Sequence, residues 1–175
     1  MEFALVAIVF FTVLFGMIEL ARAMYICNTL QEVTRRAAAA AVNTDFTIPG
    51  ALSQVQQRAV FRSDRGMLAF ADPVTDEHIR IDYMSIARTG NALQAQPITA
   101  MPSGPGDNRV NCAADPNGPS CIRLVRVRVC APSGSGGGAA CGAVPYKTIV
   151  SLIAMPFALP TSTTIMPAET LGLAP

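Results

Sequence analysis

The longest apolar stretch of the chain is FALVAIVFFTVLFGMIELARAMYICNTLQEVTRRAAAAA, which runs from Phe3 to Ala41. Its first part, from Phe3 to Ile18, contains no charged side chain and one polar side chain, Thr12. As an α-helix this part spans about 24 Å, slightly less than the ~30 Å hydrocarbon core of a bilayer. The sequence therefore predicts an N-terminal helix that enters a membrane.

The helix is expected to continue well past this uncharged part, because the first proline of the chain is Pro49. From Tyr25 onward the residues alternate between two helix faces. The apolar face consists of Ile26, Leu30, Val33, Ala37 and Ala41, and the polar face of Gln31, Glu32, Arg35 and Arg36. We expect one helix about 60 Å long, anchored at one end and packed on a globular domain at the other.

Glu19 and Arg22 end the uncharged part, and their spacing allows them to pair near the membrane boundary, where Arg22 would reach water. A cleavable signal peptide is an alternative, because Ala21-Arg22-Ala23 resembles an A-x-A cleavage site. However, no basic segment precedes the apolar run, which is also longer than most signal-peptide cores. A plain single-pass anchor is the other alternative.

The composition argues against several classes of protein. The 175 residues carry 13 Lys plus Arg against 12 Asp plus Glu, so the basic field of a nucleic-acid binder is missing. Only 14% of residues are charged, which favours a membrane or assembly surface. The single histidine, His78, excludes a His-based metal cluster, and we expect it to lie on the surface. We expect no enzyme activity, no cofactor, no catalytic site and no metal.

The ordered pattern of the N-terminal stretch is more specific than its hydrophobicity. It consists of Glu2-Phe3-Ala4-Leu5-Val6, then Phe15-Gly16-Met17-Ile18-Glu19 with Arg22 and Tyr25, then Asn28, Leu30, Gln31 and Arg35-Arg36-Ala37-Ala38. These positions resemble the V-E-F-A-L-V, F-G-x-x-E-x-x-R and N-x-L-Q-x-x-x-R-x-A-A pattern of the TadE-like family, minor pseudopilins of tight-adherence (Flp) pilus systems. The resemblance covers residues 2 to about 42.

This resemblance implies a minor pilin-like structural subunit, with an α+β fold in which a long transmembrane helix (1–42) precedes a small antiparallel-sheet domain (43–175). The implied partners are other pilin-like subunits, the pilus assembly machinery and, before assembly, membrane lipid, with no nucleic acid. The implied location is the inner membrane with a periplasmic C-terminal domain, or the pilus at the cell surface. The residues that would serve assembly are Glu2, Phe3, Gly16, Glu19, Arg22 and Tyr25.

Two other functions stay open. The first is an inner-membrane-anchored periplasmic binding or scaffold domain that never polymerises. The second is a secreted enzyme released by cleavage near Ala23.

The family resemblance also implies a leader that a prepilin peptidase removes before the apolar helix. The glutamate that matches Glu2 is normally fifth in the mature chain, and Met1 stands where the family usually has valine. We therefore expect further residues upstream, including a basic leader. A carboxylate in an apolar bundle needs a cation, and the free N-terminal amine of a neighbouring subunit would supply one for Glu2.

The remaining chain predicts a loop-rich domain. We expect a helix over Ala51–Arg62 and strands over Ile79–Met84, Arg123–Val129, Tyr146–Met155 and Thr161–Met166. Arg126 and Arg128 are interpreted as a solvated strand face, because aromatic residues do not interleave with them. The Gly/Ser run at residues 133–138 lacks the lysine of a phosphate-binding loop and is expected to form a hairpin loop.

Four cysteines, Cys112, Cys121, Cys130 and Cys141, lie close together without a C-x-x-C pair, which favours disulfides over a zinc site. Of three possible pairings we favour Cys112–Cys121 with Cys130–Cys141, each closing a Pro/Gly-rich loop. Oxidised cysteines predict a domain outside the cytoplasm, although the arginines after the apolar run would by themselves predict the opposite orientation. Cys27 is interpreted as a packing residue of the helix.

Overall fold

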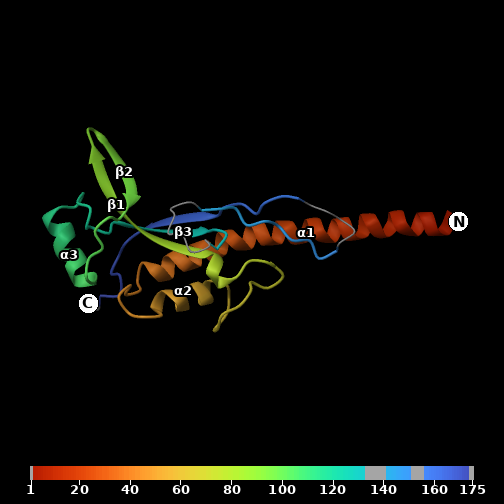
Figure 1. The fold of residues 1–175 in the computed structure, drawn as a ribbon, viewed down its shortest axis with the longest axis horizontal. Helices are drawn as coiled ribbons and strands as arrows, with labels where there is room; N and C mark the ends of the chain where they lie inside the picture. The colour runs from red at the N-terminus through yellow and green to blue at the C-terminus, as the bar shows by residue number, and fades with distance from the viewer. Residues whose placement is uncertain (1, 133–140, 151–155, 174–175) are drawn as a thin grey trace.

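A computed structural model describes residues 2–132, 141–150 and 156–173, with side chains from Phe3 onward (Figure 1). The elements are α1 (Glu2–Ala41), α2 (Ala51–Ala59), η1 (Asp76–His78), β1 (Ile79–Thr89), β2 (Ala92–Pro97), α3 (Pro105–Ala114), β3 (Leu124–Val129) and β4 (Thr163–Pro167). The fold is α+β, with a long N-terminal apolar helix followed by a small antiparallel sheet, as the sequence predicts. In Figure 1 α1 extends far beyond the domain, and the N-terminus lies at its free end.

The sheet has the strand order β2-β1-β3-β4, and every neighbouring pair is antiparallel. β1 is long enough to have two partners: residues 79–84 pair with β3, and residues 84–89 pair with β2. Gly90, with φ +63°, supplies the left-handed conformation in the short turn to β2. Figure 1 shows the β1–β2 hairpin projecting from the domain on the side away from α1.

The core lies between the second half of α1 and one face of the sheet. All five residues of the predicted apolar stripe of α1 are fully buried, and Val125, Val127 and Val129 of β3 are buried in the same cluster. Polar contacts tie the helix to β4, since the Thr34 hydroxyl lies 3.0 Å from the hydroxyls of both Ser162 and Thr164. The periodicity that predicts one α1 helix therefore also identifies its buried face.

The C-terminal segment closes over the end of α1. The backbone N–H of Leu171 donates to the carbonyl of Val42 at 2.9 Å, and the Leu171 side chain is buried. Gly172 has φ +83°, and a Cβ atom there would lie 2.3 Å from the backbone nitrogen of Asp45. This close approach requires glycine at position 172.

Several secondary-structure predictions need correction. The expected strand over 146–155 is wrong for residues 146–150, which form no strand. The chain pairs here through an isolated bridge between Pro145 and Ala158, and the Tyr146 N–H beside it donates to the carbonyl of Phe157 at 2.9 Å. Residues 151–155, like the Gly/Ser run at 133–138, lie outside the described residues. β2 and α3 were not predicted, whereas the strands over β1, β3 and β4 and the helix α2 were.

Two disulfides join Cys112 to Cys121 and Cys130 to Cys141, which is the favoured pairing. The first links α3 to the segment before β3, and the second links the end of β3 to the segment at residues 141–146. Cys27 is half-buried on α1 and is the remaining free cysteine of the chain.

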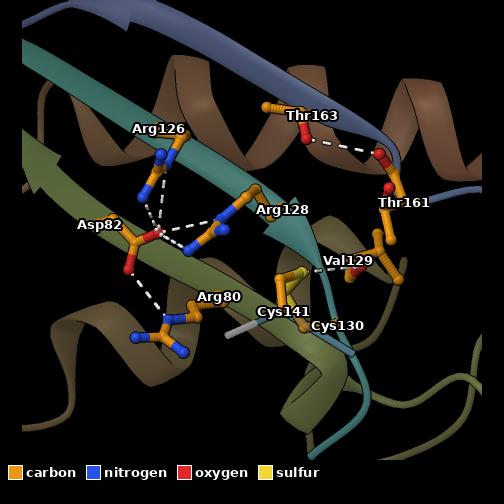
Figure 2. Close-up of a disulfide and its surroundings, with 9 residues drawn as sticks. All are labelled: Arg80, Asp82, Arg126, Arg128, Val129, Cys130, Cys141, Thr161 and Thr163. Atoms are coloured by element: carbon orange, nitrogen blue, oxygen red, sulfur yellow. Dashed lines mark hydrogen bonds and ion pairs between the residues drawn. A yellow bond between two sulfur atoms is a disulfide. The ribbon is translucent and has the colours of Figure 1, made fainter. Parts of the chain in front are cut away.

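The arginines of β3 are not a solvated face. Figure 2 shows three guanidinium groups converging on Asp82: Arg126 at 3.1 Å, Arg128 at 2.6 Å and, on the other carboxylate oxygen, Arg80 at 2.9 Å. Burial alone would raise the pKa of Asp82, but hydrogen bonds from Arg128 and Arg80 and their charges hold the pKa below its ordinary value. The prediction failed because Asp82 lies on β1, and the spacing of residues in the sequence does not show the register in which β1 pairs with β3.

His78 is also not a surface residue, since only 7% of it is exposed. Its Nδ1 accepts a hydrogen bond from the backbone N–H of Thr75 at 3.1 Å, within a capping box of η1. Burial lowers the pKa of His78, and the neighbouring carboxylates of Glu77 and Asp76 offset part of this effect.

Candidate functional site

The first half of α1 is an apolar surface that the domain does not cover. Phe3 is 86% exposed, and the other large exposed side chains of this half are Leu5, Val6, Ile8, Val9, Phe10, Phe11, Val13, Leu14, Met17 and Ile18. An exposed apolar surface of this length marks a membrane or protein contact. Among the described residues, α1 is the one helix long and apolar enough to cross a membrane, and it suits a membrane anchor.

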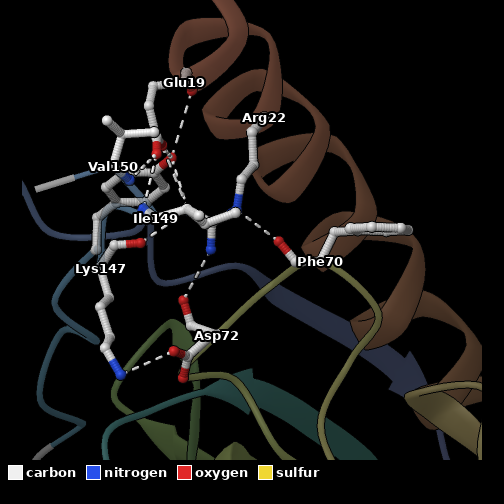
Figure 3. Close-up of polar contacts among 8 residues, drawn as sticks. Glu19, Arg22, Phe70, Asp72, Lys147, Ile149 and Val150 are labelled. Atoms are coloured by element: carbon white, nitrogen blue, oxygen red, sulfur yellow. Dashed lines mark hydrogen bonds and ion pairs between the residues drawn. The ribbon is translucent and has the colours of Figure 1, made fainter. Parts of the chain in front are cut away.

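Glu19 marks the point where α1 enters the domain, and its side chain is 1% exposed. One carboxylate oxygen accepts the backbone N–H groups of Ile149 at 2.7 Å and Val150 at 3.1 Å. The other accepts the hydroxyl of Tyr146 at 2.6 Å (Figure 3 shows Glu19 with these backbone groups). The carboxylate is therefore held by a segment more than a hundred residues away in the chain.

Arg22, one turn further along α1, is held in the same way. Its Nε donates to the carbonyl of Phe70 at 2.8 Å, and its terminal nitrogens donate to the carbonyls of Lys147 at 2.8 Å and Asp72 at 3.3 Å. Figure 3 shows these carbonyls approaching the guanidinium from two separate segments. Its Nη1 also lies 3.4 Å from the Glu19 carboxylate.

The expected i,i+3 ion pair is present, but its expected environment was wrong. Arg22 is 9% exposed, so it is enclosed by the domain and does not extend to water. A buried pair of charges is stable only when further hydrogen bonds satisfy both ions, and the backbone groups of two segments do so here. We call Glu19, Arg22 and Tyr146 the junction cluster.

Tyr146 is the member of the junction cluster that the sequence did not reveal. Its hydroxyl accepts from Arg22 at 3.1 Å while it donates to Glu19, and its ring stacks on Phe157 at 4.5 Å between centroids. Burial raises the pKa of Tyr146, and the hydrogen bond to the Glu19 carboxylate raises it further. A strand was expected from Tyr146 onward, but nothing in the neighbouring sequence places its hydroxyl against Glu19, which is 127 residues away in the chain.

The other predicted assembly residues lie along the same helix. Phe3 is fully outside the domain, Gly16 is half-buried within α1, and the Tyr25 hydroxyl donates to the carbonyl of Ala69 at 3.4 Å. The backbone of Glu2 begins α1, but its side chain lies outside the described part of the structure. The structure therefore brings Glu19, Arg22 and Tyr25 to the junction and leaves Phe3 at the free end of the helix.

Within residues 2–132, 141–150 and 156–173 there is no group of three or more His, Cys, Asp or Glu side chains that could hold a metal ion. What the arrangement offers is an apolar helix surface for lipid or protein, joined to the domain through a buried ion pair.

Residues 1–39 match the family model described as TadE-like protein, so α1 carries the pattern of the family that the sequence resembles. No curated protein and no solved structure matches the chain. The match ends within α1, and it indicates a protein associated with a Tad pilus in general.

Proposed function

We propose that this chain is a minor pilin-like structural subunit, not an enzyme, that takes part in assembling a tight-adherence pilus. The observation that carries the proposal is the TadE-like match over a helix whose first half is bare and apolar. In the membrane this half would be surrounded by lipid, and in a filament by the equivalent helices of other pilin-like subunits. The exposed side chains of this half are apolar, which supports a role in contact with lipid or protein.

The junction supports a role in transmitting force or position from helix to domain. α1 is continuous from Glu2 to Ala41, and the domain holds it from Glu19 to its end through buried apolar and ionic contacts. A helix that is withdrawn from the membrane would therefore carry the domain with it. The two disulfides favour a domain that faces the periplasm, because disulfides persist in oxidising compartments.

Glu2 is the residue we assign to subunit register. It begins α1 and precedes a surface without charges, so its carboxylate would enter an apolar bundle of helices. A carboxylate there needs a cation, and the N-terminal amine of a neighbouring subunit is at the right end of the helix to supply it.

The experiment replaces every residue from Phe3 to Ile18 with leucine in the full-length gene. A helix of leucines still crosses a bilayer, so this variant keeps the membrane anchor and removes only the specific side chains. A subunit needs the specific side chains for helix packing, and we expect normal membrane levels with few or no surface pili. Normal piliation by this variant would favour the alternative of an anchored periplasmic scaffold that never polymerises.

A further inference from the structure

The uncharged surface of α1 does not end where the uncharged sequence ends. Glu19 and Arg22 interrupt the sequence, but both are buried against the domain. Leu20, Met24 and Tyr25 of the following turns are exposed. The outward face of α1 is thus free of charged groups from Phe3 as far as Gln31, the residue before Glu32.

Two loops of the domain extend this surface. Phe70, 77% exposed, and Ile149, 69% exposed, belong to the segments whose backbone groups hold Arg22 and Glu19. Both side chains line a recess together with Ile18, Ala21, Arg22 and Tyr25 of α1, and the surface of this recess is almost entirely apolar. In Figure 3 the Phe70 ring points away from the polar contacts of the junction.

The backbone of Phe70 gives a second reason to regard this surface as functional. Phe70 has φ +57°, a left-handed conformation that large side chains rarely adopt and that costs about 1–3 kcal/mol. In water this strain would place a large aromatic ring where it gains little from burial. In an apolar or interfacial environment the same ring would be favourably placed.

We propose that Phe70 and Ile149, with Leu20, Met24 and Tyr25, insert into the interfacial layer of the bilayer and set the depth of α1. The proposal rests on the membrane-anchored state of the proposed function. Phe3–Ile18 alone spans about 24 Å, whereas Phe3–Tyr25 spans about 35 Å, enough for a hydrocarbon core of ~30 Å and part of the interface. The two loops that carry Phe70 and Ile149 allow this deeper position of α1, because they enclose Glu19 and Arg22, which would otherwise face lipid.

Other features at the same level fit an interface. Tyr25 presents a ring and a hydroxyl, the combination that is enriched at membrane surfaces. Lys147 pairs with Asp72 at 2.9 Å on the adjacent loop and is largely exposed, so its ammonium can also reach lipid phosphate. Its position beside Ile149 fits a basic residue at the headgroup level.

The test uses the absence of tryptophan from the chain. Phe70→Trp and, independently, Ile149→Trp each create a single fluorophore in the full-length protein, reconstituted in nanodiscs of phosphatidylethanolamine and phosphatidylglycerol. Phe61→Trp is the matched control, because Phe61 is also exposed and has φ +61°, but its ring lies under Arg36, 4.3 Å from its guanidinium carbon, further along α1. The quencher is the same lipid mixture brominated near the start of the acyl chains, and co-elution with the discs is measured separately.

We expect a blue shift and a loss of emission in brominated lipid for Trp at positions 70 and 149, with neither change at position 61. If the chains co-elute with discs but show equal, weak quenching at all three positions, the proposed insertion of Phe70 and Ile149 into the interfacial layer is wrong. The membrane anchor would be unaffected by that result. A blue shift without quenching would indicate that another copy of the protein, and not lipid, covers these side chains. That result would also contradict the proposed insertion. Failure to co-elute would overturn the membrane anchor itself, and the inference with it.

Discussion

At the residue scale, the junction cluster determines how the apolar helix and the domain are joined. Glu19 and Arg22 are ions inside the protein, and each is satisfied by backbone groups from segments distant in sequence. Breaking such a pair costs more than the pair contributes, because the remaining charge stays buried without a partner. The cluster is thus more important for the relative position of helix and domain than for net stability.

Arg22→Met should lower the free energy of unfolding by about 3–5 kcal/mol, because it leaves the Glu19 carboxylate uncompensated. Arg35→Met is the control, since Arg35 is exposed on the same helix and its loss should change stability by about 0.5 kcal/mol or less. Denaturant unfolding of both full-length variants in the same detergent gives the comparison. Equal losses in the two variants would show that the junction is solvated.

His78 should make stability pH-dependent near neutrality. Its pKa is lowered by burial, so below about pH 6.5 the unfolded chain binds a proton that the folded chain excludes. The folded protein therefore keeps its full stability above the pKa that His78 has in the unfolded chain. It loses stability as the pH falls from there toward the lower pKa that His78 has in the folded chain. We therefore expect lower stability at pH 5 than at pH 7.

His78→Asn keeps an acceptor near the Thr75 N–H but does not titrate, and it should flatten the profile between pH 7 and pH 5. Asp82 does not interfere, because its lowered pKa confines its contribution to loss below about pH 4. Thermal unfolding across pH measures both proteins. An unchanged slope in His78→Asn would rule out His78 as the titrating group.

At the element scale, local patterns predicted α1 and missed contacts between distant segments. Helical periodicity predicts α1, whose apolar stripe ends at Ala41 as the helix does, and alternation finds β1 and β3. β2 lacks such a signal, because its side chains are mostly exposed and it forms only as the partner of β1. The junction was half predicted: the spacing of Glu19 and Arg22 was evident, but Tyr146 reaches them through tertiary structure alone.

The C-terminal segment offers a test of how the domain closes on α1. Gly172→Ala should destabilise the protein by about 1–3 kcal/mol, because the added Cβ would meet the Asp45 backbone and the residue has φ +83°. Gly106→Ala is the control, since nothing lies within 4 Å of its Cβ position in α3, and alanine favours a helix. Chemical denaturation compares the two, and a Gly172→Ala protein as stable as Gly106→Ala would contradict the observed closure.

At the scale of the whole molecule, the protein is a long helix with a small domain on one end (Figure 1). The domain covers α1 from Glu19 onward, so the bare half is the only part of the helix that can be fully surrounded by lipid or by other helices. The TadE-like match falls on this helix and not on the domain. The proposed assembly role therefore depends on α1, and the domain would face outward from it.

The most direct measurement is surface piliation by Glu2→Ala, expressed as the full-length chain from its native gene, with membrane level measured in the same cells. Glu32→Ala is the control, because Glu32 is an exposed glutamate of the same helix near the domain. If Glu2 meets the amine of a neighbouring subunit, its loss leaves that amine uncompensated in an apolar bundle, at a cost of several kcal/mol. We predict a membrane-inserted Glu2→Ala protein with few or no pili, beside a normally piliated Glu32→Ala strain. Wild-type piliation by Glu2→Ala would contradict the assembly role and favour a solitary membrane anchor.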